Sequence, residues 1–219
     1  MKIIAYIGPK NSGKDACAKA AIEAGLVEGV VKFAGPLKSI CSDVFGIPLS
    51  VFEDMTKKEA KMEAVLNGNR LASILFRMHE YITLTPDKVL PLEEHLMKHE
   101  DILLTSPRHI LQYVGTEIIR AWDEDWHCKA AFSEEALPSP NPYSTFAVTD
   151  CRFLNEYYYL KGRHDTEFHY VHRPEAEAIL AEATHASELG LKELRLKIEN
   201  TINNTGTLEE LAEIVRKKC

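Results

Sequence analysis

The chain has 219 residues, of which 45% are hydrophobic and 27% charged, a composition close to that of ordinary globular domains. Its length fits one large domain or a domain with an insertion, and its composition excludes disordered, collagen-like and coiled-coil proteins. Acidic residues outnumber basic ones by 33 to 26, giving a formal net charge of −7; this argues against a general nucleic-acid-binding protein, because duplex binding needs a broad basic surface.

A strand, a glycine-rich loop and a helix open the chain. Residues 3–7 form a continuous apolar run that ends at Gly8, which is typical of a strand buried on both faces of a parallel sheet. An alanine-rich helix is predicted from about Gly13 to Ala24, with Gly25 as its stop. The segment between them has the spacing G-x-x-x-x-G-K of a phosphate-binding loop, in the strand–loop–helix context that the motif requires. Its residues are Gly8-Pro9-Lys10-Asn11-Ser12-Gly13-Lys14.

This loop predicts the binding of a nucleoside triphosphate. Successive backbone N–H groups would surround the β-phosphate, the helix N-terminus adds about half a positive charge, and Lys14 reaches the β- and γ-phosphate oxygens. A serine or threonine normally follows the lysine and ligates Mg²⁺, but here the residue is Asp15. Its carboxylate could hold the ion directly or through water, or could orient an acceptor. The alternative is a strand–turn–helix whose glycines only allow the turn.

The surroundings of the loop narrow the class of protein. Residues 1–38 contain six lysines against three acidic residues, whereas the rest of the chain has an excess of ten acidic residues. The local positive charge suits a triphosphate. No N-K-x-D motif for guanine recognition occurs, and the chain is short for a nucleic-acid motor. Among the proteins that use this loop, other ATPases and small-molecule kinases stay open.

The middle of the chain is predicted to be a helical insertion over about 39–143. Before it, a second strand over residues 29–34 is expected to be broken by Gly35-Pro36. Residues 39–105 have mostly helical patterns, and a proline-rich loop follows at 137–144. Three helices are indicated: one opened by the capping box Thr56-Lys57-Lys58-Glu59, one with the period of Leu71, Ile74, Leu75, Met78 and Ile82, and one starting at Ser106-Pro107.

The last third of the chain indicates an α/β fold. Strands are predicted over 145–150, 168–172 and about 197–202. A final helix is expected from Thr207 to about Lys217, opened by the capping box Thr207-x-x-Glu210. Strands separated by helical segments predict a mainly parallel sheet of about five strands flanked by helices.

The helix after Ser106 carries a polar stripe. Arg108, Gln112, Thr116 and Arg120 recur every four residues, so the stripe drifts slowly around an α-helix but stays roughly on one side. Arg108 offers a guanidinium fork for a phosphate, and Gln112 offers both a donor and an acceptor. An ordinary solvated helix face is the alternative. The opposite side is predicted to be core and comprises Ile110, Leu111, Val114, Ile118 and Ile119.

Polar residues also follow the later strands. Asp150 ends a strand where a phosphate-loop protein places its Mg²⁺-holding carboxylate, and Arg152 could neutralise transferring phosphate oxygens. Arg173 stands where such folds pass into the lid over the phosphates, with residues 184–188 in the same predicted lid. Residues 202–207 precede the last helix, in the place of an adenine-contacting loop. The structural alternatives are a turn residue for Asp150, surface ion pairs for the arginines and a plain turn for the loop.

Other features point to ordinary structure. The five cysteines include no CxxC pair, which suits a reducing cytoplasm, and no apolar stretch reaches the 18 residues of a membrane span. No A-x-A-like cleavage site follows the first apolar run. His95 and His99 have a zinc-pair spacing but no evident third ligand. Cys17, Trp122 and Trp126 fit the core better than a site.

Four segments together resemble the deoxynucleoside monophosphate kinases of bacteriophages. The Gly-Lys-Asp ending of the loop, unusual among phosphate loops, is usual in that family, and the likeness covers the core elements across most of the chain. Residues 45–105 and the proline-rich loop show little match. The segments are Gly8-Pro9-Lys10-Asn11-Ser12-Gly13-Lys14-Asp15, Phe33-Ala34-Gly35-Pro36-Leu37-Lys38, Ser106-Pro107-Arg108-His109-Ile110-Leu111-Gln112-Tyr113-Val114-Gly115-Thr116-Glu117, and Thr149-Asp150-Cys151-Arg152-Phe153-Leu154-Asn155-Glu156.

The resemblance implies a nucleoside monophosphate kinase fold formed by residues 1–219, with a lid at about 174–192, and ATP-dependent phosphorylation of a deoxynucleoside monophosphate with Mg²⁺. The polar stripe would face the acceptor nucleotide, and residues 184–188 look like a segment of the phage enzymes. The expected catalytic residues are Lys14, Asp15, Arg152 and Arg173, and the expected metal ligands are Asp15 and Asp150. The expected ATP-binding residues are Gly8, Lys10, Asn11, Ser12, Gly13, Lys14, Asp15, Asn204 and Gly206, and the acceptor-binding residues are Lys38, Arg70, Arg108, Gln112, Thr116 and Asp150.

Two other functions stay open at this stage. The chain could be a kinase for another small acceptor, such as dephospho-coenzyme A or phosphomevalonate, or a phosphate-loop module that switches a partner without transferring phosphate. The preferred base, the tolerance for ribose, the contacts of Arg173 and His185 with phosphates, and the choice between a monomer and a homodimer stay open too. We expect small-molecule partners, no nucleic acid and no membrane, in the cytoplasm.

Overall fold

A computed structural model describes the chain except for residues 55, 138–140, 142 and 182–185, and describes only the backbone of residues 181 and 186–189. The chain divides into two compact units. The first comprises Met1–Lys32 and Pro138–Cys219, and the second comprises Phe33–Leu137. In the described part of the chain, no helix has both the length and the apolar character needed to cross a membrane.

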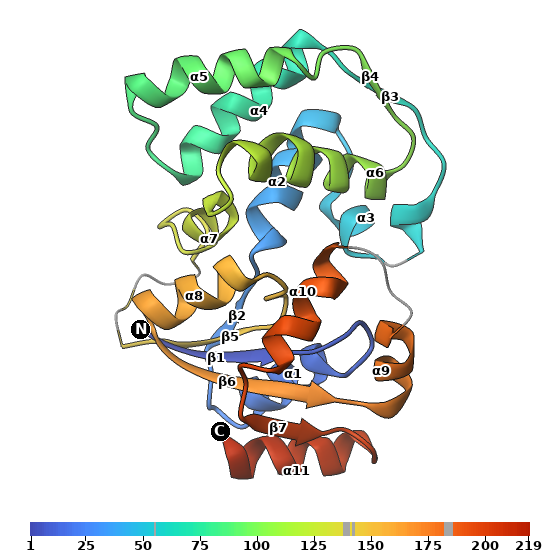
Figure 1. The fold of residues 1–219 in the computed structure, drawn as a ribbon, viewed down its shortest axis with the longest axis vertical. Helices are drawn as coiled ribbons and strands as arrows, with labels where there is room; N and C mark the ends of the chain where they lie inside the picture. The colour runs from blue at the N-terminus through green and yellow to red at the C-terminus, as the bar shows by residue number, and fades with distance from the viewer. Residues whose placement is uncertain (55, 138–140, 142, 182–185) are drawn as a thin grey trace. The chain divides into compact units, whose positions relative to one another are not determined.

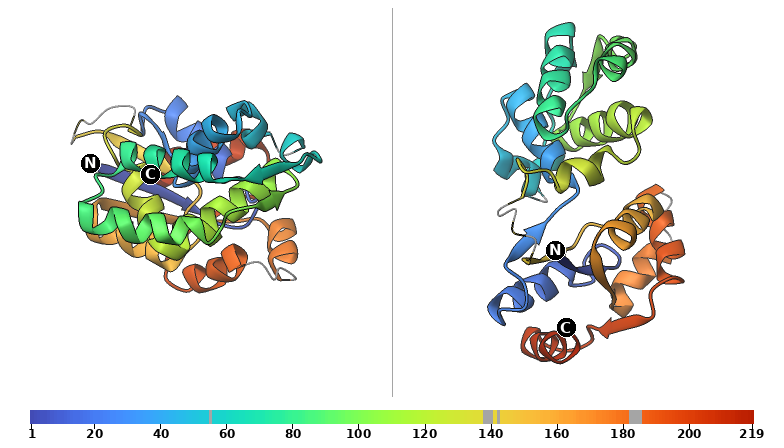
Figure 2. Two further views of the ribbon diagram at one scale, coloured as in Figure 1. Left: turned by 90° about the horizontal axis from the view of Figure 1, so that it is seen from above. Right: turned by 90° about the vertical axis from the view of Figure 1, so that its left-hand side faces the viewer.

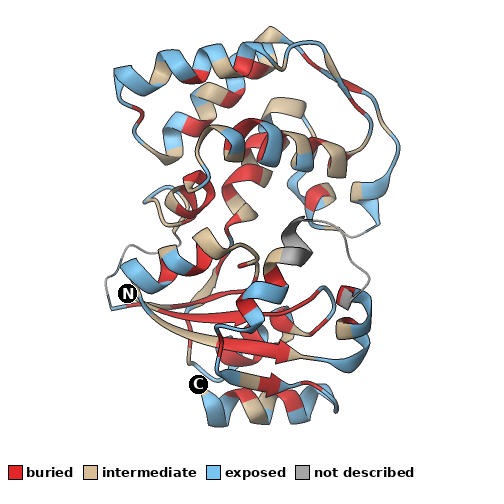
Figure 3. Ribbon diagram, viewed as in Figure 1, coloured by how far each residue is buried: buried red, intermediate tan, exposed pale blue. Residues whose placement is uncertain are grey.

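The first unit is built on a five-stranded parallel sheet, as the sequence predicts (Figure 1). β1 lies at its centre, and all its residues from Ile3 to Ile7 are at most 1% exposed, in agreement with the apolar run. The strand order is β2-β5-β1-β6-β7, and the strand bounds are β1 Lys2–Ile7, β2 Gly29–Val31, β5 Thr145–Val148, β6 Asp165–His172 and β7 Asn200–Asn203. Strands β1 and β5 are largely buried, whereas the edge strands β2 and β7 have one buried residue each (Figure 3).

Helices cover both faces of this sheet. The helices α1 (Lys14–Glu23) and α11 (Leu208–Lys218) pack on one face through small and branched side chains. On the opposite face lie α8 (Leu154–Arg163) and α10 (Ala186–Arg195), and α9 (Pro174–Ala181) follows β6 (Figures 1 and 2). The predicted capping box of α11 is confirmed, since Thr207 Oγ1 accepts from the Glu210 N–H at 3.2 Å and Glu210 Oε2 accepts from the Thr207 N–H at 2.8 Å.

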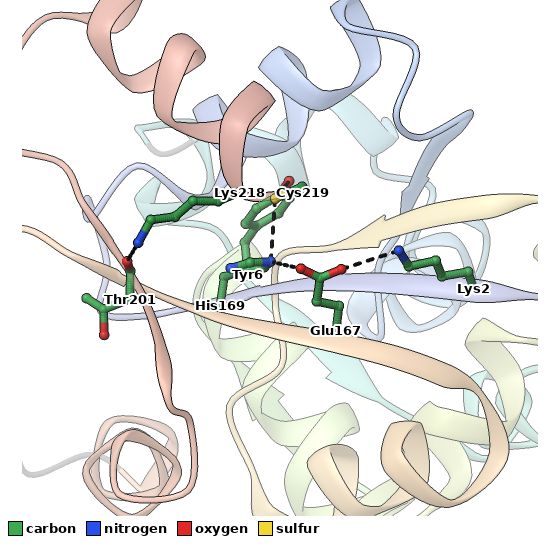
Figure 4. A network of polar contacts seen from close by, with 7 residues as sticks. All are labelled: Lys2, Tyr6, Glu167, His169, Thr201, Lys218 and Cys219. Atoms are coloured by element: carbon green, nitrogen blue, oxygen red, sulfur yellow. Dashed lines mark hydrogen bonds and ion pairs between the residues drawn. The ribbon is translucent and has the colours of Figure 1, made fainter.

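A polar network attaches the end of α11 to the sheet (Figure 4). The Tyr6 hydroxyl donates to Cys219 Sγ at 3.4 Å, and Cys219 Sγ lies 3.4 Å from His169 Nε2. The same imidazole nitrogen is 2.9 Å from Glu167, which pairs with Lys2 at 3.3 Å. Burial raises the pKa of the Tyr6 hydroxyl and of the Cys219 thiol, so both stay protonated at neutral pH. The network therefore holds structure together and offers no activated nucleophile.

The second unit is helical and has one small sheet. Its strands β3 and β4 form an antiparallel pair, and α4 and α5 pack side by side (Figures 1 and 2). The predicted helical period is confirmed in α4, where Leu71, Ile74 and Met78 are buried. The elements are α2 Ala34–Phe45, α3 Leu49–Glu53, the 3₁₀ turn η1 Lys57–Glu59, β3 Ala64–Leu66, α4 Gly68–Tyr81, α5 Pro86–Met97, β4 Ile102–Leu104, α6 Pro107–Gln112, the π-helix η2 Tyr113–Arg120 and α7 Trp126–Ala131.

The helix predicted from Ser106 changes type along its length. As expected, Pro107 occupies the first position of α6, and Ser106 Oγ accepts from the His109 N–H at 3.1 Å. From Tyr113 to Arg120 the chain continues as the π-helix η2. A π-turn holds more than four residues and an α-turn 3.6. The slow drift expected of an i, i+4 stripe on an α-helix is therefore reversed over this segment.

Two buried or half-buried histidines bind carbonyl oxygens of the π-helix. His127 of α7 has Nε2 3.1 Å from the Gly115 oxygen, and His95 of α5 has Nε2 2.9 Å from the Ile118 oxygen. A carbonyl oxygen only accepts, so both imidazoles donate from Nε2. Burial lowers the pKa of His127 to about 4, despite the hydrogen bond to Gly115. His127 is therefore a neutral donor at physiological pH.

Several local predictions are wrong. Strand β2 ends at Val31, and Gly35-Pro36 lies in the first turn of α2, where a proline without an N–H is tolerated. Thr56 makes no side-chain cap: the Asp54 carboxylate accepts from the Thr56 and Lys57 N–H groups instead, and only a single 3₁₀ turn follows. Neither the β3–β4 pair nor α8 was expected. Residues 138–140 and 142 of the proline-rich loop lie outside the described residues.

Candidate nucleotide-binding site

The candidate site lies at the carboxyl edge of the parallel sheet. The phosphate loop follows β1, residues Thr149 and Asp150 follow β5, and Asn204 follows β7. Strands β5 and β6 both pair with β1, so their ends meet beside the loop. Ligands of open α/β sheets bind at this edge. The sheet order therefore brings together residues that are up to 196 positions apart in the chain, Gly8 and Asn204.

Packing against neighbouring strands fixes the backbone of the loop. Gly13 has φ 103°, and a Cβ atom there would collide with Nδ2 of Asn204. A Cβ atom at Gly8 would lie 2.6 Å from the Val171 carbonyl oxygen. The Asn204 amide donates to the Ser12 carbonyl oxygen at 2.8 Å. The two motif glycines are thus required by close approaches of other chain segments.

The interior of the loop presents donors that suit an anion. Helix α1 begins at Lys14 after Gly13, which has no side chain to cap it, and the N-terminus of a helix attracts anions. Ser12 is fully buried, and its Oγ has no hydrogen-bond partner among the described residues. Ser12 Oγ would be 2.8 Å from a Cβ at Gly8, which places it inside the turn. Phosphate oxygens would accept from the Ser12 hydroxyl and suit the helix N-terminus.

Lys14 is buried at the mouth of this loop. Its Nζ donates to the carbonyl oxygens of Gly8 at 2.7 Å and Pro9 at 2.6 Å, and the residue is only 8% exposed. The ammonium is therefore held over the turn by the loop's own backbone. Lys10 and Asn11 are exposed, and Asn11 adopts a positive φ of 66°.

The Asp15 carboxylate is bound by two side chains, Thr149 and Lys32, for which the sequence predicts no role. The hydroxyl of Thr149, at the end of β5, donates to Asp15 Oδ1 at 2.9 Å, and Lys32 Nζ lies 3.4 Å from the same oxygen. Partial burial raises the pKa of Asp15, but the hydrogen bond from Thr149 and the charges of Lys32 and Lys14 together lower it further than burial raises it. The carboxyl group is therefore ionised at neutral pH. No motif assigned a role to Thr149 or Lys32, because their contacts with Asp15 depend on sheet pairing.

Asp150 and Arg152 lie in the loop between β5 and α8, and both are half-buried. The Arg152 N–H donates to Glu156 Oε2 at 2.7 Å, so the first turn of α8 fixes this loop. Helix α10 also approaches it closely, because a Cβ at Gly190 would collide with the Arg152 carbonyl oxygen. The structure thus places the backbone of Arg152 next to a helix of the predicted lid, within the first unit.

The remaining predicted site residues of the first unit contact residues close to them in the sequence or lie outside the described residues. Arg173 is exposed and its Nε donates to Glu175 at 3.2 Å. Gly206 precedes α11, and a Cβ there would collide with the Glu210 carboxylate, so its place is explained by the cap of α11. His185 lies outside the described residues.

The predicted acceptor-binding stripe lies in the second unit. The side expected to be core is confirmed, since Ile110, Val114, Ile118 and Ile119 are buried, whereas Leu111 is half-buried. Gln112 and Thr116 are exposed, and Lys38 on α2 is half-exposed. Arg108 forms an ion pair through Nε with Glu59. Among the described residues, neither terminal guanidinium nitrogen of Arg108 has a hydrogen-bond or ion-pair partner, so the fork keeps donors for a ligand.

Arg70, His95 and His99 each make hydrogen bonds within the second unit. The Arg70 guanidinium donates to the Val65 carbonyl oxygen at 2.5 Å and lies 5.0 Å from the centre of the Phe45 ring. His99 Nδ1 is 3.0 Å from the Tyr113 hydroxyl. Within the described part of the chain, no group of three or more His, Cys, Asp and Glu side chains is arranged to hold a metal ion by itself.

The sheet order, the loop after β1 and the helices on both faces define the class: an α/β fold of the phosphate-loop, nucleoside monophosphate kinase-like type. No known family model matches the chain. The chain is similar to a protein of Acanthamoeba polyphaga mimivirus named "Putative deoxynucleotide monophosphate kinase", with 23% identity over 223 residues, 96% of this chain and 92% of the relative. This likeness supports a kinase.

Proposed function

We propose that the protein is a phosphotransferase that moves the γ-phosphate of ATP to a deoxynucleoside monophosphate, forming the diphosphate and ADP. The observation that carries this proposal is the loop of residues 8–14. There, a buried lysine, a buried hydroxyl with no partner in the described part of the chain and a helix N-terminus without a side-chain cap surround one turn of backbone. The similarity to the mimivirus protein over nearly the whole chain supports the choice of acceptor.

Several residues of the first unit have a role in this reaction. The loop N–H groups and Lys14 bind the β- and γ-phosphates, with Asn204 holding the loop in shape through the Ser12 oxygen. Arg152, beside the end of β5, neutralises charge on the transferring group, and Arg173 adds charge from the start of the lid. No general base is required, because the attacking phosphate oxygen of the acceptor is already anionic at neutral pH. Closure of the lid excludes water, which would otherwise accept the phosphate.

The acceptor is proposed to bind the second unit. Arg108, oriented by Glu59, presents its terminal nitrogens to the monophosphate. Gln112 and Thr116, exposed on the same stripe, contact the base or sugar. Lys38 and Arg70 belong to the same proposed set, although Arg70 already holds the Val65 carbonyl oxygen.

Oxygen donors in the first unit fit Mg²⁺. The Asp15 carboxylate is ionised, with its Oδ1 bound by Thr149 and Lys32, and the Asp150 carboxyl lies at the end of the adjacent strand. Carboxylates together with substrate phosphates are the ligands that Mg²⁺ prefers in kinases. When bound, the ion would neutralise charge on the β- and γ-phosphates. Asp15 and Asp150 are the residues that we propose hold it.

A coupled assay for ADP tests the proposal. We expect ATP turnover to depend on a deoxynucleoside monophosphate, with dAMP, dCMP, dGMP and dTMP compared in one panel beside dephospho-coenzyme A and phosphomevalonate. A Lys14→Met variant should lose this turnover and serves as the background. Turnover with one of the last two acceptors alone would identify a different small-molecule kinase. No stimulation by any acceptor, with ATP still bound, would leave a nucleotide-binding module.

A further inference from the structure

The carboxylate and the hydroxyl of the candidate site stand in unusual places. In phosphate loops generally, the residue after the lysine supplies a hydroxyl for the metal ion, and the next strand supplies a carboxylate. Here Asp15 supplies a carboxylate after the lysine, and Thr149 supplies a hydroxyl at the end of β5, just before Asp150. The site therefore carries one more carboxylate than an ordinary loop.

Thr149 fixes the orientation of Asp15. The residue is 3% exposed, and its single hydroxyl hydrogen is donated to Asp15 Oδ1 at 2.9 Å. Lys32 approaches the same oxygen at 3.4 Å. Among the described residues, Oδ2 of Asp15 has no protein partner, and the Asp15 side chain is 77% exposed. One oxygen is thus used by the protein and the other is left for an external ligand.

Lys32 offsets the additional negative charge. Replacing a neutral hydroxyl by a carboxylate places a charge of −1 next to the site of a triphosphate, and the Lys32 ammonium restores the balance. The Lys32 side chain is 42% exposed, and an exposed ion pair of this kind is weak. A divalent cation with phosphate ligands can therefore displace it, whereas the hydrogen bond from buried Thr149 is kept.

We propose that Thr149 and Lys32 are positioning residues for the magnesium–nucleotide complex. Thr149 holds Asp15 so that Oδ2 is presented to the metal ion, and Lys32 neutralises Asp15 until the ion takes over that role. This inference rests on the proposed binding of ATP and Mg²⁺ at the loop, but it does not depend on which acceptor receives the phosphate.

The two residues are expected to act in opposite directions. Without Lys32, metal-free ATP should bind more weakly, because the uncompensated Asp15 repels the phosphates, and the tightening caused by Mg²⁺ should increase. Without the Thr149 hydroxyl, the tightening by Mg²⁺ should decrease, because Asp15 is no longer held in place. A purely structural role would change both ATP affinities in the same sense.

The experiment measures the ATP dissociation constant by calorimetry with EDTA and with saturating MgCl₂, without any acceptor. We expect Lys32→Met to weaken metal-free binding about threefold to tenfold. It should also raise the ratio of the dissociation constant in EDTA to the dissociation constant in MgCl₂. Thr149→Val, which keeps the shape of the side chain, should lower that ratio about threefold to tenfold, and Thr149→Ser should restore it. The thermal unfolding midpoint shows whether each variant is folded.

The Asp15→Ser variant provides the matched control, because it restores the usual loop residue. In that background, Lys32→Met and Thr149→Val should no longer change the ratio. Unchanged ratios for both substitutions in the wild-type background, or equal effects in the Asp15→Ser background, would overturn the inference. A wild type that binds ATP with Mg²⁺ but phosphorylates no monophosphate would overturn the proposed function alone. If the ATP affinity of the wild type is the same with and without Mg²⁺, the inference is overturned even if the protein is an active kinase.

Discussion

The two units use their polar residues in different ways. In the first unit, the residues of the loop are consecutive in the chain. Residues at the ends of other strands of the sheet hold them in place: the Asn204 amide donates to the Ser12 oxygen, and the Thr149 hydroxyl donates to Asp15. In the second unit, the predicted acceptor residues are spread over several helices, and each has its own local surroundings, as Arg108 on Glu59 shows. A binding site formed by backbone groups can be specified by a few consecutive residues. A binding site formed by side chains from several helices depends on how those helices pack.

The largest expected effect concerns Lys14. Replacing it by methionine should weaken ATP binding about a thousandfold, or about 4 kcal/mol, because the buried ammonium would otherwise form charge-assisted hydrogen bonds with the phosphates. Calorimetric titration with ATP measures this. Lys19→Met removes the same charge from an exposed position of α1, where Lys19 pairs with Glu23, and should change the affinity less than twofold. Equal losses in both variants would show that net charge, not the loop, binds ATP.

In the second unit, His127 should make stability depend on pH. Its pKa is lowered by burial to about 4, whereas in the unfolded chain it is about 6.5. Above pH 6.5 both states are neutral; as the pH falls from 6.5 towards 4, only the unfolded state gains the proton, so the folded state loses about 3 kcal/mol.

Urea unfolding at pH 7 and at pH 4.5 tests this prediction. His127→Gln keeps an amide donor near the Gly115 oxygen but cannot titrate, so its loss of stability over this range should be smaller than that of the wild type by about 3 kcal/mol. Parallel curves for the two proteins would show that His127 is not the titrating group.

A pair of glycine substitutions separates backbone strain from the close approach to Asn204. Gly13 and Gly25 both have positive φ, but only at Gly13 would a Cβ collide with another side chain, and Gly25 faces open space. Gly25→Ala should cost about 1 kcal/mol of unfolding free energy, and Gly13→Ala about 2 kcal/mol more. Only Gly13→Ala should weaken ATP binding. Equal unfolding curves, with ATP affinity kept in both, would contradict the packing described for the loop.

The smallest expected effect is on the acceptor side. Arg108→Ala should raise the KM for the monophosphate about tenfold, or about 1.4 kcal/mol, and leave the KM for ATP unchanged, because its guanidinium keeps donors beyond the one that binds Glu59. Steady-state kinetics with each substrate varied in turn measures both constants. Arg77→Ala is the control, since Arg77 pairs with Asp43 and Glu80. Equal changes in both KM values for Arg108→Ala would remove its assignment to the acceptor.

Sequence patterns predicted the features that are local in the chain. The buried strand β1, the loop, helix α1 and the capping box at Thr207 are each specified by a few consecutive residues, and the structure agrees with them. The capping box at Thr56 failed because Asp54, two residues earlier, binds the same N–H groups. The π-helix was missed because its histidine donors come from α5 and α7.

Within the site, the same limit applies. The glycines and Lys14 follow from the motif, but nothing in the sequence near Asp15 indicates that Thr149, 134 residues away, donates to it. That contact depends on β5 pairing with β1 in the observed register, with Ala5 opposite Val148. Strand order is set by the packing of the whole sheet, so it is not readable from the residues that it brings together.

The hydrogen bond from Asn204 to the Ser12 oxygen also bears on how the protein matures during translation. A nascent chain is released from its amino end, so the loop leaves the ribosome long before the amide that holds it, 192 residues later. Until β7 has joined the edge of the sheet, the loop lacks that anchor, and incomplete chains would bind little ATP. Competence for nucleotide binding would then arrive only after β7 and Asn204 have left the ribosome and joined the sheet.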